Sequence, residues 1–392
     1  MDRLYLDNAA TSFPKPEAVT EAMTAYATRV GASAGRGAYA EAAESGRIIQ
    51  NCREKIATLI GATDPRNIVM TFNCSDGLNI VLHGLLSKGN HAIATWMDHN
   101  SILRPLNDLA ARVGVEVDFV PTGSDGIVDP ADIRKAIRPN TKLIAMLHGS
   151  NVTGTVEPTA EVARIAKEHG VLTLIDAAQT MGHWDINVER DGYDFLAAPG
   201  HKGLLGPLGT GFLYIRPGLE KQVRPIKQGG TGTWSEEAVQ PEAMPDKYEP
   251  GSHNAIGIAG LAAGVEYVLQ RGVKTIRDHD RQLCQTFAAG LDQIDGLTWY
   301  GPRDVEKRVG VFSVRMPGYT PTELSKALET KFGILTRSGL HCAPLAHKTI
   351  GTLETAGTTR FSFGPFVTVE NIGYVMNSLK KLAKRPAVIS SP

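Results

Sequence analysis

The chain has 392 residues, of which 42% are hydrophobic and 21% are charged, a composition typical of globular proteins. Because this length exceeds one ordinary hydrophobic core, we expect a large domain and a smaller one. The 41 basic and 41 acidic residues give a formal net charge of zero, so no basic field exists to attract nucleic acid or an anionic membrane. Small molecules and proteins are therefore the expected partners.

Two further features of the sequence bear on location and redox chemistry. The N-terminal residues lack a basic segment followed by an apolar core, and no apolar run reaches the length that spans a membrane, so we expect a cytoplasmic protein. The four cysteines, Cys52, Cys74, Cys284 and Cys342, are scattered and contain no CxxC pair. The sequence therefore predicts neither a disulfide framework nor a metal site.

The chain begins with a short extended arm. Residues 4–7 are expected to be extended and to end in a turn of small residues, after which two prolines favour a helix over 17–30. A glycine-rich link over 31–37 leads to a long amphipathic helix. Its apolar residues at helical spacing are Ile48, Cys52, Ile56 and Leu59.

From residue 68 onward, apolar strands alternate with helical segments. Near-continuous apolar strands of this kind predict an α/β fold, in which a mostly parallel sheet is covered by helices on both faces. The expected strands cover residues 68–72, 91–96, 115–120, 143–147 and 171–176. The expected helices begin near residue 75 or cover 102–113, 132–137 and 160–169.

The regular alternation of strands and helices ends after residue 214. Pro- and Gly-rich sequence over 227–250 predicts a long loop that is too polar for a core. We expect an N-terminal arm over 1–14, a large domain over 15–264, and a small α+β domain over 265–392. The later helices are expected at 254–269, 271–291, 321–332 and 369–383, and the later strands at 309–315 and 361–363.

The most informative stretch runs from Asp176 to Lys202. Asp176 ends an apolar strand, and Lys202 follows Gly200-His201 in a loop rich in glycine and proline. A lone lysine is usually a solvated surface charge, but a lysine reached from a strand-terminal acid suggests a Schiff-base cofactor held at both ends. Pyridoxal phosphate requires such an amine, an acid that keeps its pyridine nitrogen protonated, and a cradle for its phosphate.

Polar residues also follow other strands of the expected sheet, where open parallel sheets bind ligands. Cys74 and Ser75 begin a helix whose N-terminal N–H groups suit a phosphate, although a simple helix cap explains them as well. The imidazole of His99 suits stacking on a planar cofactor, and a structural histidine is the alternative. Residues 148–151 and 176–179 follow two more strands, and residues 200–202 form the fifth such polar segment. Polar groups at five strand ends together favour one shared ligand site.

The C-terminal third contains two further candidates. Cys342 lies in RSGLHCAP, on an expected loop with basic neighbours, whereas Cys52 lies on an apolar helical stripe. This context favours Cys342 as a nucleophilic thiol, with an inert thiol as the alternative. Arg360 has a two-pronged guanidinium that suits a substrate carboxylate, and its alternative is a surface arginine that caps a strand.

The motifs together resemble those of the class V aminotransferase group, and within it the cysteine desulfurases of the SufS/CsdA type. The resemblance covers essentially the whole chain. It implies a pyridoxal-phosphate-dependent transferase of fold type I that acts as a homodimer with shared active sites. The motifs that carry it are YLDNAATS, CSDGLN, MDHNS, HGSNVTGT, LIDAAQ, GHKGLLGPLGTG, EPGSHN, RSGLHCAP and TRFSF.

The resemblance also implies roles for single residues. Catalytic roles fall to Lys202 as the Schiff-base lysine, to Cys342 as the nucleophile that carries sulfur as a persulfide, and to His99, which stacks on the ring. The other cofactor residues would be Asp176 at the pyridine nitrogen, Gln179 at the phenolic oxygen, His201, Cys74 through its backbone, Ser75, and Ser252 from the other subunit. The substrate residues would be Ala9, Arg36, Asn151 and Arg360.

The implied reaction converts L-cysteine to L-alanine and passes sulfur from Cys342 to an acceptor protein. Lys202 would remove the α-proton, and the thiolate of Cys342 would attack the substrate sulfur. Alternatives on the same scaffold are a selenocysteine lyase, a cysteine sulfinate desulfinase, or an epimerase or aminotransferase of the same class. The alternative outside enzymology is a cofactor-free scaffold protein.

Two positions depart from the family pattern. Pro199 stands where the family commonly has Ser or Thr as a phosphate ligand, so Ser75 or neighbouring backbone would have to compensate for the missing hydroxyl. Ser252 stands where Thr is usual, a change that conserves the hydroxyl.

Overall fold

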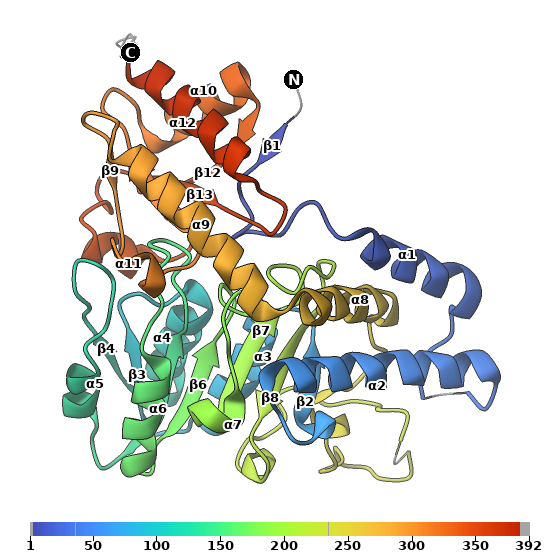
Figure 1. Ribbon diagram of the computed structural model, residues 1–392. Coiled ribbons are helices and arrows are strands. Elements are labelled where there is room, and N and C mark those ends of the chain that lie inside the picture. The colour runs from blue at the N-terminus through green and yellow to red at the C-terminus, as the bar shows by residue number, and fades with distance from the viewer. Residues whose placement is uncertain (1–2, 36, 234, 385–392) are drawn as a thin grey trace.

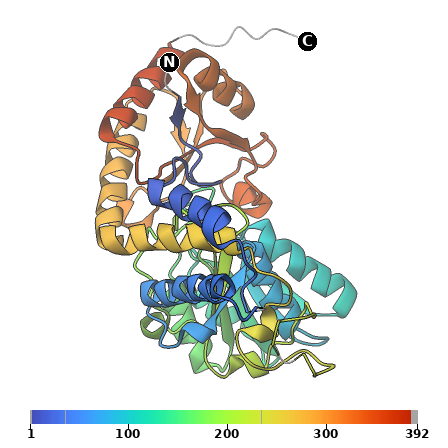
Figure 2. The ribbon, with the colours of Figure 1, turned by 90° about the vertical axis from the view of Figure 1, so that its right-hand side faces the viewer.

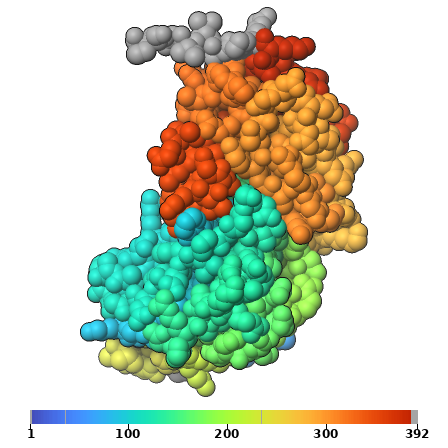
Figure 3. All heavy atoms as spheres, turned by 90° about the vertical axis from the view of Figure 1, so that its left-hand side faces the viewer, coloured from blue at the N-terminus to red at the C-terminus, as the bar shows by residue number. Residues whose placement is uncertain are grey.

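The computed structural model describes residues 3–35, 37–233 and 235–384, which form a large lobe and a small lobe (Figure 1). No helix of these residues is both long and apolar enough to cross a membrane. In Figure 3 the small lobe, orange to red, sits directly on the cyan and teal surface of the large lobe.

A seven-stranded sheet forms the centre of the large lobe, in the order β2-β8-β7-β6-β5-β3-β4. Neighbouring strands are parallel except around β8, which is antiparallel to both β7 and β2. The prediction of a mostly parallel sheet is therefore confirmed, and β7 and β8 are two strands of this sheet that were not predicted. The strands are β2 (Ile68–Thr71), β3 (His91–Thr95), β4 (Glu116–Val120), β5 (Thr141–Leu147), β6 (Leu172–Asp176), β7 (Phe195–Pro199) and β8 (Gly211–Ile215).

Two hydrophobic layers cover the two faces of this sheet. Because side chains alternate across a strand, Val69 faces the layer under α3 and α4, whereas Ile68 and Met70 face the layer under α2 and α8. Figure 2 shows α1, α2 and α8 packed side by side on that second face. The helices of this lobe are α1 (Glu17–Ala25), continued by a π-helical turn (Tyr26–Val30), α2 (Ala40–Ile60), α3 (Cys74–Leu85), α4 (Asn100–Val113), α5 (Pro130–Ala136), α6 (Thr159–Glu168), α7 (Val188–Asp191) and α8 (Ala255–Arg271).

The small lobe is an antiparallel sheet of four strands, in the order β12-β13-β10-β9, covered by helices. Its strands are β9 (Thr298–Trp299), β10 (Val311–Arg315), β12 (Arg337–Gly339) and β13 (Thr358–Ser362), and its helices are α9 (Val273–Leu291), α10 (Pro321–Phe332), α11 (Pro344–Thr349) and α12 (Val369–Ala383). Single 3-10 turns occur at Pro65–Asn67, Leu219–Lys221, Asp246–Tyr248 and Val305–Lys307.

The N-terminal arm packs on the small lobe. Strand β1 (Leu4–Tyr5) pairs in parallel with β11 (Ile334–Leu335), and Leu6 is fully buried in the core of that lobe. At the other boundary, the predicted limit after residue 264 falls inside α8, whose Val265 belongs to the large core. The domain limits stay a prediction. Because α8 contributes to the core of the large lobe and α9 to that of the small lobe, a boundary at Gly272, between these helices, is favoured.

The segment 227–250 contains little regular structure, apart from its 3-10 turn. Its last residues, however, are buried: Arg53 of α2 forms an ion pair with Glu249, in which both side chains are at most 5% exposed. Glu249 also accepts the backbone N–H of Met70 in β2. The expectation that this whole segment is too polar for the interior is therefore wrong at its C-terminal end, because buried charges are tolerated when they are paired.

Candidate active site

A pocket opens at the carboxyl ends of the large sheet, where parallel sheets bind ligands. Polar residues that follow β2, β3, β5, β6 and β7 meet there, as the sequence analysis expected of one shared site. The lining residues are Asn73, Cys74, Ser75, His99, Ser101, Leu147, Gly149, Asn151, Asp176, Ala178, Gln179, Pro199, His201 and Lys202.

Asp176 and Lys202 lie together in this pocket. Oδ1 of Asp176 accepts the Ala178 N–H at 2.9 Å and the Cys74 thiol at 3.3 Å, so Oδ2 is left for a cationic ligand. Burial lowers the pKa of Lys202 below its ordinary value, against the opposing effect of Asp176, so the neutral amine, which is a base and a nucleophile, becomes more accessible. Burial and the Asp176 carboxylate together raise the pKa of Cys74 well above its ordinary value, so this thiol stays protonated and donates.

His99 forms part of the same pocket from the start of α4. Its Nδ1 accepts the backbone N–H of Ser101 at 3.1 Å, so the neutral ring carries its proton on Nε2. Burial lowers the pKa of His99 to about 4. A neutral, fixed imidazole of this kind suits stacking on a planar ring, the role that the sequence predicts.

Two hydroxyls and a helix N-terminus form a cradle on the other side of the pocket. The N-terminal turn of α3, which Asn73 caps, leaves backbone N–H groups without intrahelical acceptors. The hydroxyls of Ser75 and Ser101 lie 2.6 Å apart. Ser101 was not predicted as a site residue, although it lies in the MDHNS motif. Its hydroxyl is a second one in the cradle and can replace the hydroxyl that Pro199 lacks.

A second, independent observation indicates that the pocket can hold pyridoxal phosphate. Nδ1 of His201 is buried and has no hydrogen-bond partner in the described part of the chain, and this side chain lines the pocket. Burial lowers the pKa of His201 to about 4. An unpaired buried nitrogen beside a lysine, an acid and an anion cradle matches the donors and acceptors of the cofactor.

Arg360 lies in the middle of β13 and is 1% exposed, so the alternative of a surface arginine is wrong. Its Nη2 contacts Asp7 Oδ1 at 2.5 Å, and its Nη1 donates to the Asn151 carbonyl at 3.2 Å. Its Nε, like Oδ1 of Asn151, has no partner within the residues described. These unpaired groups suit a substrate carboxylate and amine.

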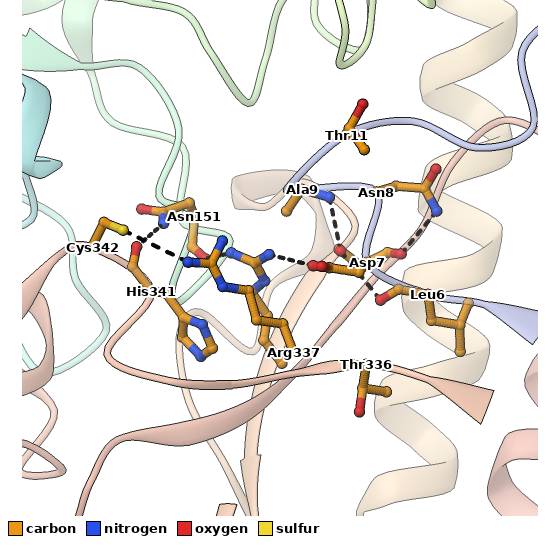
Figure 4. A network of polar contacts seen from close by, with 12 residues as sticks. Leu6, Asp7, Asn8, Ala9, Thr11, Asn151, Thr336, Arg337, His341 and Cys342 are labelled. Atoms are coloured by element: carbon orange, nitrogen blue, oxygen red, sulfur yellow. Dashed lines mark hydrogen bonds and ion pairs between the residues drawn. The ribbon is translucent and has the colours of Figure 1, made fainter. Parts of the chain in front are cut away.

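Cys342 is exposed and lies on the loop after β12 (Figure 4). Arg337 Nη2 lies 3.7 Å from its Sγ. The carbonyl of His341 accepts from Asn151 at 2.6 Å, and the carbonyl of Cys342 accepts from the N–H of Asn100 at 2.8 Å. Contacts from both lobes thus hold an exposed thiol beside a guanidinium.

Cys342 differs from Cys52 and Cys284 in both backbone conformation and exposure. His341 and Cys342 adopt left-handed conformations, with φ of 49° and 60°, which non-glycine residues rarely adopt. Cys52 and Cys284 are buried, and burial raises the pKa of each to about 12. Those two thiols are therefore unsuited to nucleophilic chemistry.

Of the remaining predicted site residues, Gln179 lies in the pocket and Ser252 lies outside it. Gln179 lines the pocket and donates to the Ala9 carbonyl at 3.1 Å. Ser252 is exposed and lies outside this pocket, in a separate depression with Phe72 and Lys227. Arg36 lies outside the described residues. In residues 3–35, 37–233 and 235–384, no group of three or more His, Cys, Asp or Glu is arranged to hold a metal ion.

Three contributors to the site were not predicted from the sequence. Besides Ser101, these are Arg337, which lies within the RSGLHCAP motif, and Asp7, which lies within YLDNAATS. Asp98 is a fourth polar group of interest, because it is fully buried and joins the ends of β3 and β5 by accepting from Thr95 and Leu147. A strand-terminal acid was the available signal for Asp98, whereas the contacts of the others depend on the tertiary structure.

The fold and this pocket define a pyridoxal-phosphate-dependent enzyme of fold type I. The chain belongs to the aminotransferase class-V family, whose model matches residues 4–375. A probable cysteine desulfurase of Methanothermobacter thermautotrophicus is 38% identical over 386 residues, covering 97% of this chain and 95% of the relative. A cysteine desulfurase of Escherichia coli O157:H7 is 30% identical over 387 residues, with 96% and 93% coverage.

Solved structures agree with this assignment. The apo structure of a cysteine desulfurase from Thermococcus onnurineus NA1 has a TM-score of 0.92 at 34% identity, and covers 97% of this chain and 95% of that one. The cysteine desulfurase CsdA from Escherichia coli has a TM-score of 0.88 at 27% identity, with 98% and 96% coverage. The family resemblance and the fold class inferred from the sequence are therefore confirmed.

Proposed function

We propose that this protein is an L-cysteine desulfurase, which converts L-cysteine to L-alanine and holds the sulfur as a persulfide on Cys342. The observation that carries the proposal is an exposed thiol, Cys342, beside Arg337, on a loop whose His341 carbonyl accepts from Asn151 of the lysine-containing pocket. Relatives that match nearly the whole chain bear the same activity in their names.

Each chemical task has a group suited to it in the pocket. Asp176, Gln179, His99, His201 and the cradle of Ser75 and Ser101 would hold pyridoxal phosphate, with Lys202 as its attachment point. When bound, the cofactor supplies an electron sink for the bond-breaking steps at the substrate carbon. Arg360 and Asn151 would orient the substrate carboxylate and amine.

Lys202 acts as the base, because burial favours its neutral amine, and its Nζ takes the α-proton of the substrate. The thiolate of Cys342 then attacks the substrate sulfur. The S–S bond forms as the carbon–sulfur bond breaks, the electron pair goes to the carbon side, and protons added there give alanine. No external oxidant or reductant is needed until the persulfide is discharged.

The test measures alanine and sulfide formed from L-cysteine, with and without a thiol reductant. Wild-type protein is expected to form alanine once per Cys342 without reductant and repeatedly with it. Lys202→Ala is expected to be inactive, and Cys342→Ala to lose at least 100-fold, whereas Cys284→Ala, a buried thiol of α9, serves as the matched control. Full sulfur release by Cys342→Ala would rule out the persulfide.

The proposal extends to partners and location. An exposed persulfide is open to discharge by an acceptor protein that docks over the Cys342 loop, and the identity of that protein is an outcome for capture experiments with Cys342 in the persulfide form. We further propose a cytoplasmic homodimer, in which Ser252 reaches the phosphate site of the other subunit. The exposure of Ser252 and of nearby Phe72 and Leu208 supports this part of the proposal.

A further inference from the structure

A histidine–aspartate pair lies beside the turn that carries Lys202, and none of the steps above uses it. Nδ1 of His183 lies 2.7 Å from Oδ2 of Asp280 in α9. Asp280 is 2% exposed, and its Oδ1 has no hydrogen-bond partner among the described residues. Helix α9 runs from the small lobe down to the top of the large sheet (Figure 1), so the pair joins the two lobes at the active site.

The ring of His183 packs directly against the residue that follows Lys202. A Cβ atom added to Gly203 would lie 2.5 Å from Cδ2 and 2.9 Å from Nε2 of His183. A Cβ on Gly182, where φ is +83°, would overlap the carbonyl oxygen of Gly203. The two turns therefore pack backbone against backbone, and the Cδ2–Nε2 edge of the imidazole faces the Lys202 turn.

His183 and Lys202 also line the same small cavity. It measures about 20 Å³, and Gln179 and Ala9 contribute to its wall. A polar cavity of this size has room for one water molecule. Because Lys202, Gln179 and His183 all line this cavity, a water held there has polar side chains around it, those of Lys202 and His183 among them.

We propose that His183 and Asp280 form a proton relay for Lys202. The inference rests on the proposed function, in which Lys202 becomes an ammonium when it takes the substrate proton and must lose a proton before its amine can act as a nucleophile again. Nζ gives a proton to the water, and the water gives one to Nε2 of His183. The Asp280 carboxylate balances the new imidazolium charge, and no bond other than N–H and O–H is made or broken.

The charges around His183 suit this task. Burial disfavours its charged form and Arg277 of α9 repels it, but Asp280 outweighs both effects and raises the pKa of His183 above its ordinary value. Lys202 is the other titratable group in this cavity. By contrast, burial lowers the pKa of both His99 and His201 to about 4, so neither can hold a proton at neutral pH. The relay is therefore assigned to His183.

The first test uses the apoprotein, so that its outcome does not depend on the reaction. Nitrogen-15 NMR of labelled histidines would follow the titration of His183, assigned by its loss in His183→Asn. We expect a pKa above the ordinary histidine value in the wild type and a lower pKa in Asp280→Asn, because the variant removes the charge that raises it. A His183 pKa that does not change in Asp280→Asn overturns the relay, whether or not the protein acts on cysteine.

The second test uses the holoenzyme and L-cysteine deuterated at Cα, in ordinary water. The relay exchanges the deuteron on Lys202 with solvent, so wild-type alanine should retain little deuterium by mass spectrometry. In His183→Asn the side chain still donates to Asp280 but cannot accept a proton, and retention is expected to rise at least threefold. His169→Asn, on an exposed histidine after α6, is the matched control and should behave as wild type.

The two readouts separate the possible explanations. A purely structural role for His183 lowers turnover without changing the deuterium retained, and that result overturns the relay. Asp280→Asn is the second variant and should raise retention in the same direction. If the wild-type holoenzyme forms no alanine from L-cysteine, the proposed function fails, and the NMR titration alone then decides the relay.

Discussion

Asp7 holds the guanidinium of Arg360 through an ion pair of 2.5 Å between Asp7 Oδ1 and Arg360 Nη2. The two residues come from opposite ends of the chain and meet because the N-terminal arm packs on the small lobe. Asp7 thereby fixes the orientation of the side chain proposed to grip the substrate carboxylate. Preorganisation of this kind lowers the entropy that substrate binding must overcome.

Asp7→Ala is expected to raise the KM for L-cysteine about tenfold, the effect of losing one charged hydrogen bond, with a smaller change in kcat. Asp7→Asn retains an oxygen acceptor for Nη2 and should raise KM only about threefold. Arg360→Lys loses the two-pronged geometry and should be worse than either. Steady-state kinetics check the series, and equal effects of Asp7→Ala and Asp7→Asn would contradict a positioning role.

Ser101→Ala is expected to weaken the binding of pyridoxal phosphate. Its hydroxyl lies 2.6 Å from that of Ser75, and one hydrogen bond to a charged group contributes about 1.5–3 kcal/mol, or roughly 10- to 100-fold in Kd. Titration of the apoprotein with the cofactor, followed by absorbance, measures the effect. Ser124→Ala, at an exposed position, is the control, and an unchanged Kd for Ser101→Ala would exclude this hydroxyl from the cradle.

Glu157→Gln is expected to stabilise the protein in a pH-dependent way. Burial raises the pKa of Glu157 to about 8 from its ordinary value of 4.5. The folded protein then binds the proton more tightly than the unfolded chain, so stability is lost as pH rises from about 4.5 through 8. Glutamine resembles the neutral acid and removes this loss, so we expect a gain on the order of 4 kcal/mol at pH 8 and almost none at pH 4.5.

Urea unfolding of the apoprotein at both pH values checks this prediction. Glu161→Gln, which removes an exposed carboxylate from α6, controls for the change in net charge. A gain of equal size at both pH values would show that packing, and not titration, is responsible.

Leu208→Asp is expected to dissociate the proposed homodimer. Leu208 is 66% exposed and Phe72 is 53% exposed; Phe72 lines the depression that contains Ser252, and Leu208 precedes Gly209, which also lines it. Apolar side chains on a surface of this kind mark association sites, and a buried aspartate there would be unpaired. Light scattering after gel filtration should show about half the wild-type mass, whereas Val113→Asp, at an exposed apolar residue of α4, should leave the mass unchanged.

The apolar strands and the polar residues at their ends were predictable because they depend on local patterns. Asp176 follows a continuous apolar strand, and Lys202 follows a glycine-rich turn, so both carry their signals in neighbouring residues. Strands β7 and β8 are as long as the predicted β3 and β6, but β7 ends in Pro199 and the two flank the Gly- and Pro-rich loop after it, which masks their strand pattern. The sequence left open whether Arg360 binds a substrate carboxylate or is a surface arginine that caps a strand, because the ion pair with Asp7 that makes its burial tolerable joins residues far apart in the chain.

The amino-acid sequence by itself determined the α/β class, the edge of the sheet that carries the pocket, and the residue types available for chemistry, because periodicity and strand ends are local properties. Only the tertiary structure decided which distant side chains meet: Ser75 with Ser101, Asp7 with Arg360, and His183 with Asp280. Such pairs depend on how the lobes pack and on strand register. No local pattern in one chain encodes that geometry.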